Sequence, residues 1–541
     1  MHKVLIIGMD GGTWTVLQPA LERGYMPFLK TLADSGASGV LKSTIPAITP
    51  AAWGSFQTGM NPGDNGVFDF YRWDKNRKTH HVVSSRDLAL TIWDMAGRQG
   101  KKVGLLNVPM TYPPKPVNGY MITGIMTPSL DSPFTYPAGL GQELLSAVPA
   151  YQLVNREEAA AGSPHENFED YVKQMASIAQ TRAQAARFLL GKEAFDLCMV
   201  HFMTSDVLQH PLFCYLDESH PLYDAQKHRY ILEHFYRPLD QALHNVYQAF
   251  SENSPDDCTT FVISDHGFQS HYKRFNLGLW CYRQGYLKLN TRAAKTPIIK
   301  KITRALRIGK LLGLILPSKT IADMERSLRL DIGLYDWNHS RVFCQGTSGE
   351  AFIYLLEGKT QQQKTTAEEI AQKLSVLKDP HSGESIIERI YHKEELYHGR
   401  YLEQMPDLIV IPAAGYSLGS LFQEDSELCH TVNPREDIHM GKHHPDGILI
   451  AAGPLIEPQK DIEARLLDIT PTILFGLGIP IRNDSDGQVL TNLFTEKFRS
   501  RRAVRFFDYE SQQPASPDND SVYSSADEKE IEKRLEDLGY L

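Results

Sequence analysis

The chain has 541 residues, of which 42% are hydrophobic, 22% charged and 10% aromatic, and its formal net charge is -9. This composition is ordinary for a globular protein, and the negative charge argues against the broad basic surface by which proteins bind a nucleic acid duplex. The length suits several average domains or one large α/β domain with an insertion.

The six cysteines are scattered, and none of them stands in CxxC spacing. This pattern argues against a zinc knuckle or a dense disulfide framework and favours a reducing compartment. The opening stretch MHKVLIIGMDGG has too short an apolar run for a signal peptide, and no longer run predicts a transmembrane segment. We therefore expect a cytoplasmic protein.

Short apolar runs of β character alternate along the chain with longer helical patterns. This alternation predicts a mostly parallel central sheet with helices on both faces. The predicted strands cover 3–8, 102–108, 196–202, 259–264, 407–411 and 447–452. Ligands of such sheets gather beyond the carboxyl ends of the strands, so the residues that follow these runs are the first candidates for function.

Aspartates and histidines occupy these positions: Asp10 after the first strand, Asp206 and His210 after the third, Asp265 and His266 after the fourth, and His443 just before the last. Each alone has an ordinary explanation as a turn residue, a cap or an idle histidine. Gathered at one sheet edge, three carboxylates and three imidazoles would repel and desolvate one another unless positive charge lay between them. The pattern therefore predicts bound divalent metal.

The spacing and type of these residues indicate which ions, and how many. Asp206 and His210 stand four residues apart in DVLQH, so one helical turn brings both side chains to the same side. Oxygen and imidazole donors without thiolate suit zinc, manganese or iron better than magnesium or calcium. Because a catalytic zinc takes about three protein ligands, this set suits two ions about 3.5–4 Å apart, an arrangement that serves displacement at phosphorus. We expect zinc, with manganese as the second choice.

Thr49 lies in the stretch IPAITPAAWGSFQTG, at the start of a predicted helix. The local sequence suits an N-cap threonine followed by proline at the first helical position. A threonine hydroxyl bound to a divalent ion would be an activated nucleophile, and the two roles are compatible. At a helix N-terminus, backbone N–H groups and the positive end of the helix dipole would also face the phosphoryl oxygens.

Several stretches stand in an order typical of one enzyme group: GMDGG, TPAAWGSFQTGMNPGDNGVFDF, DVLQH, SDHGF, GKHHPDGILIAAGP and LLDITPTIL. They resemble the alkaline phosphatase superfamily, and most of all its type I phosphodiesterase/nucleotide pyrophosphatase branch. NVPMTYPP, from Asn107, and the closing LEDLGYL are similar to bacterial and archaeal members. The resemblance implies an alkaline phosphatase-like α/β fold and a metal-dependent phosphoric ester hydrolase.

The resemblance also implies roles for the residues. One ion would be held by Asp206, His210 and His443. The other would be held by Asp10, Asp265 and His266, with Thr49 as the nucleophile bound to it. A covalent phosphothreonine would form and then be hydrolysed, and the substrate would be a small phosphoester or nucleotide-like molecule.

The sequence departs from the family pattern close to the substrate. In nucleotide pyrophosphatases an asparagine downstream of the nucleophile helps to hold a phosphoryl oxygen, and Phe70 stands at the matching place here. Neutral residues surround Thr49, which favours diesters over monoesters, whose extra charge needs a positive donor. The candidate substrate contacts are Trp53, Asn107 and Arg72. The alternatives are a phosphomonoesterase, a phosphoryl or phosphonate transferase or hydrolase, and a non-catalytic binding protein.

The catalytic motifs fall within 1–271 and 406–507, and the intervening 272–405 is predicted to be an inserted, cap-like segment. Within it, residues 290–322 include eight basic residues and no acidic residue. This pattern favours a solvated amphipathic helix, with steering of an anionic substrate or contact with an anionic membrane surface as the alternatives.

The segment 508–541 is predicted to be a polar linker followed by a helix. Ser525 and Glu528 would form a capping box, and Ile531, Leu535 and Leu538 form one apolar stripe. Such a stripe needs a partner surface, either on the same chain or on a second subunit through self-association.

Overall fold

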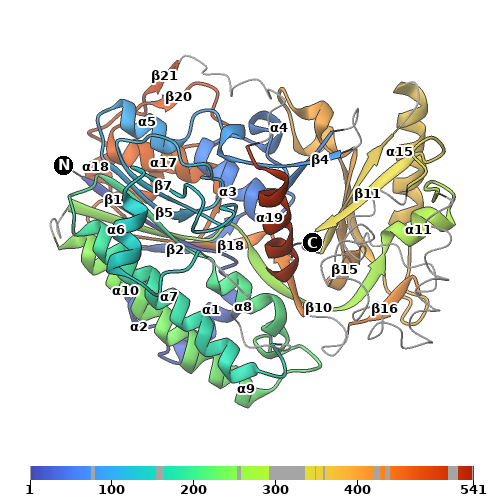
Figure 1. The fold of residues 1–541 in the computed structure, drawn as a ribbon, viewed down its shortest axis with the longest axis horizontal. Coiled ribbons are helices and arrows are strands. Elements are labelled where there is room, and N and C mark those ends of the chain that lie inside the picture. The colour runs from blue at the N-terminus through green and yellow to red at the C-terminus, as the bar shows by residue number, and fades with distance from the viewer. Residues whose placement is uncertain are drawn as a thin grey trace.

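A computed structural model describes residues 2–74, 79–153, 164–252, 257–290, 335–347, 349–356, 360–419, 427–432, 439–509, 522–538 and 540. Its centre is a nine-stranded sheet in the order β19-β2-β18-β9-β1-β8-β5-β6-β7 (Figure 1). The bounds are β1 (Lys3–Met9), β2 (Ala37–Lys42), β5 (Val103–Val108), β6 (Gly119–Thr123), β7 (Thr135–Tyr136), β8 (Leu197–Phe202), β9 (Cys258–Ile263), β18 (Asp446–Ala452) and β19 (Gln459–Arg465). Neighbouring strands from β9 to β6 are parallel, whereas β18 runs antiparallel to β9 and β2.

The alternation of side chains along β1 shows how both faces of this sheet are covered. Leu5 and Ile7 belong to a core that includes α2 (Pro27–Ser35), α7 (Phe168–Leu190) and α10 (Arg237–Ser251). Val4 and Ile6 belong to a second core with α3 (Thr49–Thr58), α5 (Ile92–Arg98) and α17 (Leu466–Leu477). Since successive residues of a strand point to opposite faces, the two helix groups cover opposite sides of the sheet (Figure 1). The predicted α/β class is confirmed.

The remaining elements are shorter or peripheral. Further helices are α1 (Trp14–Glu22), α4 (Pro62–Asn65), α6 (Leu140–Ala147), α8 (Thr204–Leu212), α9 (Ala225–Ile231), α11 (Leu277–Arg283), α15 (Thr360–Ser375), α16 (Lys393–Leu396), α18 (Glu496–Arg499) and α19 (Ser525–Leu538). Two small strand pairs are β3 (Tyr71–Asp74) with β4 (Thr79–Val82), and β20 (Ile481–Arg482) with β21 (Phe506–Phe507).

Two four-stranded sheets lie beside the central sheet, on the right of Figure 1. One contains β10 (Gly267–Asn276), β15 (Gly415–Gly419), β16 (Cys429–Thr431) and β17 (Gly441–His444), and the other contains β11 (Val342–Thr347), β12 (Glu350–Leu355), β13 (Ile387–His392) and β14 (Leu408–Pro412). The strand predicted at 407–411 is β14, which pairs antiparallel with β12 and β13 and does not join the central sheet. The strand at 407–411 therefore pairs with strands of the predicted inserted segment, and the domain division stays a prediction.

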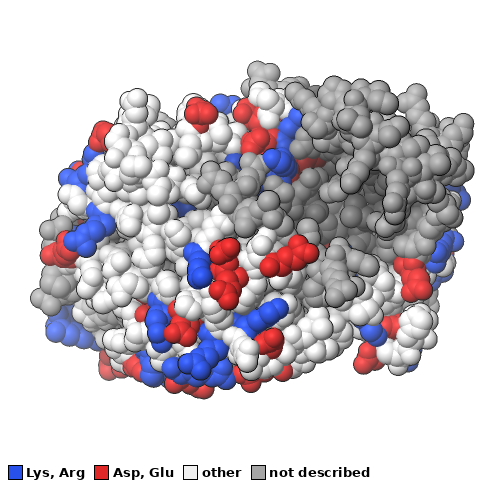
Figure 2. Space-filling view, turned by 60° about the horizontal axis from the view of Figure 1, so that its bottom comes forward, with Lys and Arg blue, Asp and Glu red and all other residues white. Residues whose placement is uncertain are grey.

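The described residues bear on only some of the predictions about surface charge, membrane contact and location. The eight basic residues of 290–322 lie outside the described residues, so their role stays a prediction. On the face drawn in Figure 2, the basic and acidic side chains of the described residues are interspersed. Among the described residues, no helix has the length and apolar character needed to cross a membrane. All six cysteines are buried thiols, and the cytoplasmic location stays a prediction.

The helix α19 packs on its own chain. The residues of its apolar stripe are all buried: Ile531, Leu535 and Leu538. Arg534 is buried as well, and its guanidinium donates to the backbone carbonyls of Ile125, Thr127 and Pro128. The stripe therefore has a partner surface within the chain, and self-association through this helix stays a prediction.

The capping box of α19 lies one residue earlier than predicted. The Asp527 carboxylate accepts from the Ser524 N–H at 2.9 Å and from the Ser524 hydroxyl at 2.7 Å. The Ser524 oxygen in turn accepts from the Asp527 N–H at 3.2 Å. Serines stand at both 524 and 525, each followed three residues later by an acid, so the spacing by itself does not choose between the two pairs.

Arg534→Ala should loosen α19 without unfolding the sheet. The substitution leaves three buried carbonyls without a charged donor, and hydrogen bonds of this kind contribute about 1.5–3 kcal/mol each. We expect faster amide hydrogen exchange over 525–538 and unchanged protection in β1 and β8. Lys533→Ala, at an exposed position of the same helix, is the control. Equal protection of α19 in the two variants would contradict the anchoring role of Arg534.

Candidate metal centre

Parallel strands bring most of the predicted ligands to one edge of the central sheet. Asp10 directly follows β1, and Asp265 and His266 follow its neighbour β9. β8, on the other side of β1, leads into α8, which carries Asp206 and His210 one turn apart. The carboxyl ends of three adjacent strands therefore position five of these side chains.

His443 reaches the same edge from the opposite chain direction. It lies on β17, where it is paired with Phe268 of β10, and the chain then enters β18. Because β18 runs antiparallel to β9, its first residues lie where β9 ends. This geometry explains why His443 precedes its strand while the other candidates follow theirs.

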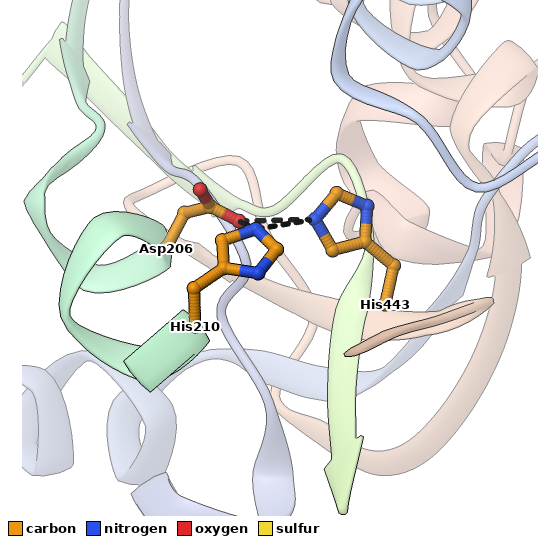
Figure 3. A group of neighbouring side chains, drawn as sticks. All are labelled: Asp206, His210 and His443. Carbon is orange, nitrogen blue, oxygen red and sulfur yellow. Dashed lines mark hydrogen bonds and ion pairs between the residues drawn. The ribbon is translucent and has the colours of Figure 1, made fainter. Parts of the chain in front are cut away.

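The first group of ligand candidates is Asp206, His210 and His443. Asp206 Oδ1 lies 3.2 Å from His443 Nε2 and 3.5 Å from His210 Nε2, and the two imidazole nitrogens are 3.2 Å apart. Figure 3 shows the three polar ends pointing toward one another, with Asp206 and His210 on one helix. All three side chains are buried.

The second group is Asp10, Asp265 and His266, and all three residues are fully buried. His266 Nε2 lies 3.3 Å from Asp265 Oδ2 and 3.7 Å from Asp10 Oδ1. The same nitrogen is 4.0 Å from Asp206 Oδ1, and the rings of His266 and His443 stack with centroids 3.5 Å apart. The two groups are therefore adjacent.

The hydrogen bonds of two histidines fix which ring nitrogen carries the proton. His443 Nδ1 donates to the Ala47 carbonyl at 2.8 Å, and His266 Nδ1 donates to the Gly267 carbonyl at 3.1 Å. In a neutral imidazole the other nitrogen, Nε2, then presents a lone pair. Both Nε2 atoms face carboxylate oxygens, so lone pairs meet lone pairs in each group. A cation between them resolves this repulsion, as metal-ligating histidines require.

The carboxylates give the same indication. Among the described residues, no hydrogen-bond donor reaches Asp10 Oδ1, Asp206 Oδ1 or Asp265 Oδ2, although all three are buried. Burial raises the pKa of Asp206 to about 7, and burial with the neighbouring charges of Asp10 and Asp206 raises the pKa of Asp265 well above its usual value. The residues therefore fit two divalent ions, each held by oxygen and imidazole donors.

Thr49 is the first residue of α3, and Ile48 occupies the N-cap position. The alternative in which Thr49 caps the helix is therefore not what the structure shows. The Thr49 hydroxyl is fully buried and lies 3.5 Å from His266 Nε2, beside the second group of ligands.

Trp53 supports a ligand candidate and does not offer a surface for substrate, contrary to the prediction. The ring is fully buried, and its indole N–H donates to Asp10 Oδ2 at 3.0 Å. His201, which the sequence analysis missed, lies 2.9 Å from the same oxygen. A polar residue in the otherwise apolar strand LCMVHF was the signal that could have revealed it. Together Trp53 and His201 turn Asp10 Oδ1 toward the second group.

Asn107 and Arg72 are likewise engaged within the protein, and their contact with substrate stays a prediction. The Asn107 amide donates to the Thr123 carbonyl at 3.1 Å and accepts from the Tyr151 hydroxyl at 2.5 Å, and its backbone hydrogen-bonds His201. The Arg72 guanidinium is paired with Asp87. One further residue escaped the sequence analysis: Tyr540, whose hydroxyl donates to Asp206 Oδ2.

Comparison with known proteins identifies the family of the chain. The sequence model of the type I phosphodiesterase/nucleotide pyrophosphatase family matches residues 4–446. The chain belongs to this family. Its members are phosphoester hydrolases that depend on metal, so the predicted recognition and the general enzyme class are confirmed. The search of curated proteins found no match to this sequence.

Solved structures share the fold at low sequence identity. Human ectonucleotide pyrophosphatase/phosphodiesterase 5 is 14% identical with a TM-score of 0.50, over 91% of this chain and 100% of that chain. Phosphonoacetate hydrolase from Sinorhizobium meliloti 1021, in complex with phosphonoacetate, is 14% identical with a TM-score of 0.55, over 88% and 95%. An inactive threonine-to-alanine variant of the murine phosphodiesterase 5, in complex with AMP, is 13% identical with a TM-score of 0.50, over 92% and 100%.

The purified protein should contain close to two divalent ions per chain, because two of the groups of possible ligands are fully buried and lie next to each other. Chelation should abolish turnover, and zinc or manganese should restore it. His443→Ala should lower both metal content and rate, since it leaves its group with two ligands. His444→Ala is the control, because the His444 ring accepts from the Asp446 N–H in a local turn. Full metal content and full activity in His443→Ala would contradict the assignment.

Proposed function

We propose that this family member is a two-metal phosphodiesterase or pyrophosphatase-like hydrolase in which Thr49 is the nucleophile. The observation that carries the proposal is the position of the Thr49 hydroxyl, 3.5 Å from His266 Nε2, where three buried carboxylates and three buried imidazoles meet. Because all the donor atoms are carboxylate oxygens or imidazole nitrogens, they favour zinc, with manganese as the second choice.

The reaction that these residues support has two displacements at phosphorus. Two divalent ions, when bound, supply positive charge to the attacking and leaving oxygens. Thr49 Oγ1 forms a bond to phosphorus while the bond from phosphorus to the leaving oxygen breaks, and the hydroxyl proton passes to solvent. Water then cleaves the phosphothreonine, which regenerates Thr49 and releases the phosphorylated product and one proton.

The start of α3 adds to this arrangement. Thr49 is its first residue, so the N-terminal backbone N–H groups and the positive end of the helix dipole lie at the nucleophile. A phosphoryl group attached to Thr49 would be held where helices bind phosphate. The complete burial of Thr49 strengthens each electrostatic contact around it.

Thr49→Ala should lower the rate by about three orders of magnitude or more while the fold and most of the bound metal remain. The change removes the nucleophile and no carboxylate or imidazole ligand. Thr49→Ser should keep measurable activity, since a hydroxyl remains. Thr58→Ala is the matched control, because Thr58 lies at the other end of α3 and its hydroxyl donates to the Gly54 carbonyl. A Thr49→Ala enzyme nearly as fast as the parent would exclude the phosphothreonine mechanism.

The charges around Thr49 favour a diester substrate. A monoester is a dianion whose extra charge calls for a further cationic donor, and Arg72 is paired with Asp87. Lys442, next to His443, is buried, and the carboxylate of Glu350 compensates its positive charge. A diester carries one charge less and therefore needs no such donor.

We expect kcat/KM for bis-p-nitrophenyl phosphate, or for a nucleotide p-nitrophenyl ester, to exceed that for p-nitrophenyl phosphate by about tenfold or more, which is about 1.4 kcal/mol in transition-state stabilisation. All substrates are compared on one metal-loaded preparation, with phosphonoacetate included to detect phosphonate hydrolysis. A tenfold advantage for the monoester would overturn the diester preference and leave the broader phosphohydrolase activity in place.

A further inference from the structure

The C-terminal segment places the phenol group of Tyr540 at the candidate metal centre. Beyond the last turn of α19, the Tyr540 N–H donates to the Leu535 carbonyl at 2.8 Å, a bond of the kind that closes helix C-termini. The Tyr540 side chain is 1% exposed, and its hydroxyl donates to Asp206 Oδ2 at 2.5 Å. A residue far from Asp206 in sequence thus contacts a ligand candidate directly.

The two carboxylate oxygens of Asp206 have different partners. Oδ2 accepts from Tyr540, whereas Oδ1 faces His443 Nε2 at 3.2 Å and His210 Nε2 at 3.5 Å. A carboxylate held in this way cannot rotate its free oxygen out of the ligand group without losing a buried hydrogen bond.

The other two carboxylates of the centre show the same division. Asp10 Oδ2 accepts from Trp53 and lies 2.9 Å from His201 Nε2, so Oδ1 faces His266. Asp265 Oδ1 accepts from the Gly11 N–H at 3.2 Å, so Oδ2 faces His266. Among the described residues, each ligand carboxylate thus has one oxygen held by the protein and one directed into the centre, and for Asp206 the holder comes from the C-terminal segment.

Tyr540 also borders the place of the reaction. Its hydroxyl contacts the Thr49 hydroxyl, and its ring packs at 5.4 Å from the His210 ring and 5.9 Å from the His443 ring. Phe70 also packs against the Tyr540 ring, with centroids 4.7 Å apart. The phenol therefore lies between the first ligand group and the proposed nucleophile.

The anchoring of α19 argues for a permanent part of the site. Leu535 and Leu538 are buried in the main core, and Arg534 donates to three backbone carbonyls of the catalytic part. A segment that only blocked the site would have to move away during turnover. Its departure would cost free energy, because it would expose the apolar stripe and break the hydrogen bonds of the buried Arg534 guanidinium.

We propose that Tyr540 is a positioning residue of the metal centre, which holds Asp206 in its ligand orientation from the C-terminal helix. This inference rests on the proposed metal assignment and adds a residue that reaches the centre from outside the catalytic motifs. Tyr540 acts through Asp206, so its primary effect is on metal binding, and its effect on turnover follows from that.

The test compares Tyr540→Phe with Tyr523→Phe in the full chain. Tyr523 is a buried tyrosine of the same segment that stacks on Tyr112 and donates to the Val83 carbonyl, away from the ligand groups. Metal-free protein is titrated with Zn²⁺ against a chromophoric chelator, and thermal unfolding of each variant is recorded beside it. Tyr540→Phe should weaken binding of one of the two ions by about 10–100-fold. Tyr523→Phe should leave both affinities unchanged.

Turnover of bis-p-nitrophenyl phosphate gives the second readout. Tyr540→Phe should lose activity at limiting Zn²⁺ and recover most of it in excess Zn²⁺, which a general loss of structure would not do. A chain that ends at Leu538 should show the same pattern more strongly, because it lacks the ring as well as the hydroxyl. Zinc affinity equal to that of the parent in Tyr540→Phe and in the shortened chain would overturn the proposal. A rise in the activity of either one would also overturn it, because the segment would then be an inhibitor. A parent protein that binds no metal would instead refute the proposed function itself.

Discussion

Lone pairs that face one another in the buried interior are the constraint on which this structure depends. Asp10, Asp206 and Asp265 are completely buried, and each directs one oxygen toward imidazole nitrogens. The imidazoles of His266 and His443 cannot relieve the repulsion by donating, because their other nitrogens already donate to backbone carbonyls. Buried uncompensated charge costs several kcal/mol per ion, and cations between the groups would remove this cost. Metal bound at these ligand candidates would stabilise the folded protein, because the unfolded chain has no preformed site.

The sheet supplies the geometry that this constraint requires. Parallel neighbours β9, β1 and β8 end side by side, which places residues from three distant stretches of chain at one edge. The antiparallel β18 lets His443 join them, and β17 pairs with the start of β10. Farther along, β10 pairs with β15 and β16, so one long strand connects the metal centre to the adjoining sheet. β10 itself runs from the ligand candidates into the segment predicted to be inserted, so the two parts share one strand.

The residues behind the ligands determine their orientation. His201 and Trp53 hold Asp10, a backbone N–H holds Asp265, and Tyr540 holds Asp206. In metal sites such outer contacts fix the direction of the ligand and contribute to metal affinity. Here they come from a strand, a helix, a turn and the C-terminal segment. The Asn107 side chain belongs to this support too, because its backbone hydrogen-bonds His201 and its amide is fixed by Thr123 and Tyr151.

The sequence by itself determined the elements whose signal is local. Apolar runs predicted five of the nine central strands, which are β1, β5, β8, β9 and β18, and the aspartates and histidines at their ends predicted the six ligand candidates. The division of these six residues into two groups was implied by the family resemblance. Tertiary structure alone decided the rest. The partner of β14 depends on which edge its hydrogen-bonding groups meet, and an apolar run does not encode that choice. Trp53 and Asn107 resembled substrate contacts until packing showed them to be engaged by the protein. His201 and Tyr540 acquire their roles only through partners nearly two hundred and more than three hundred residues away, respectively. Such pairings depend on the packing of whole layers, which one stretch of sequence cannot specify.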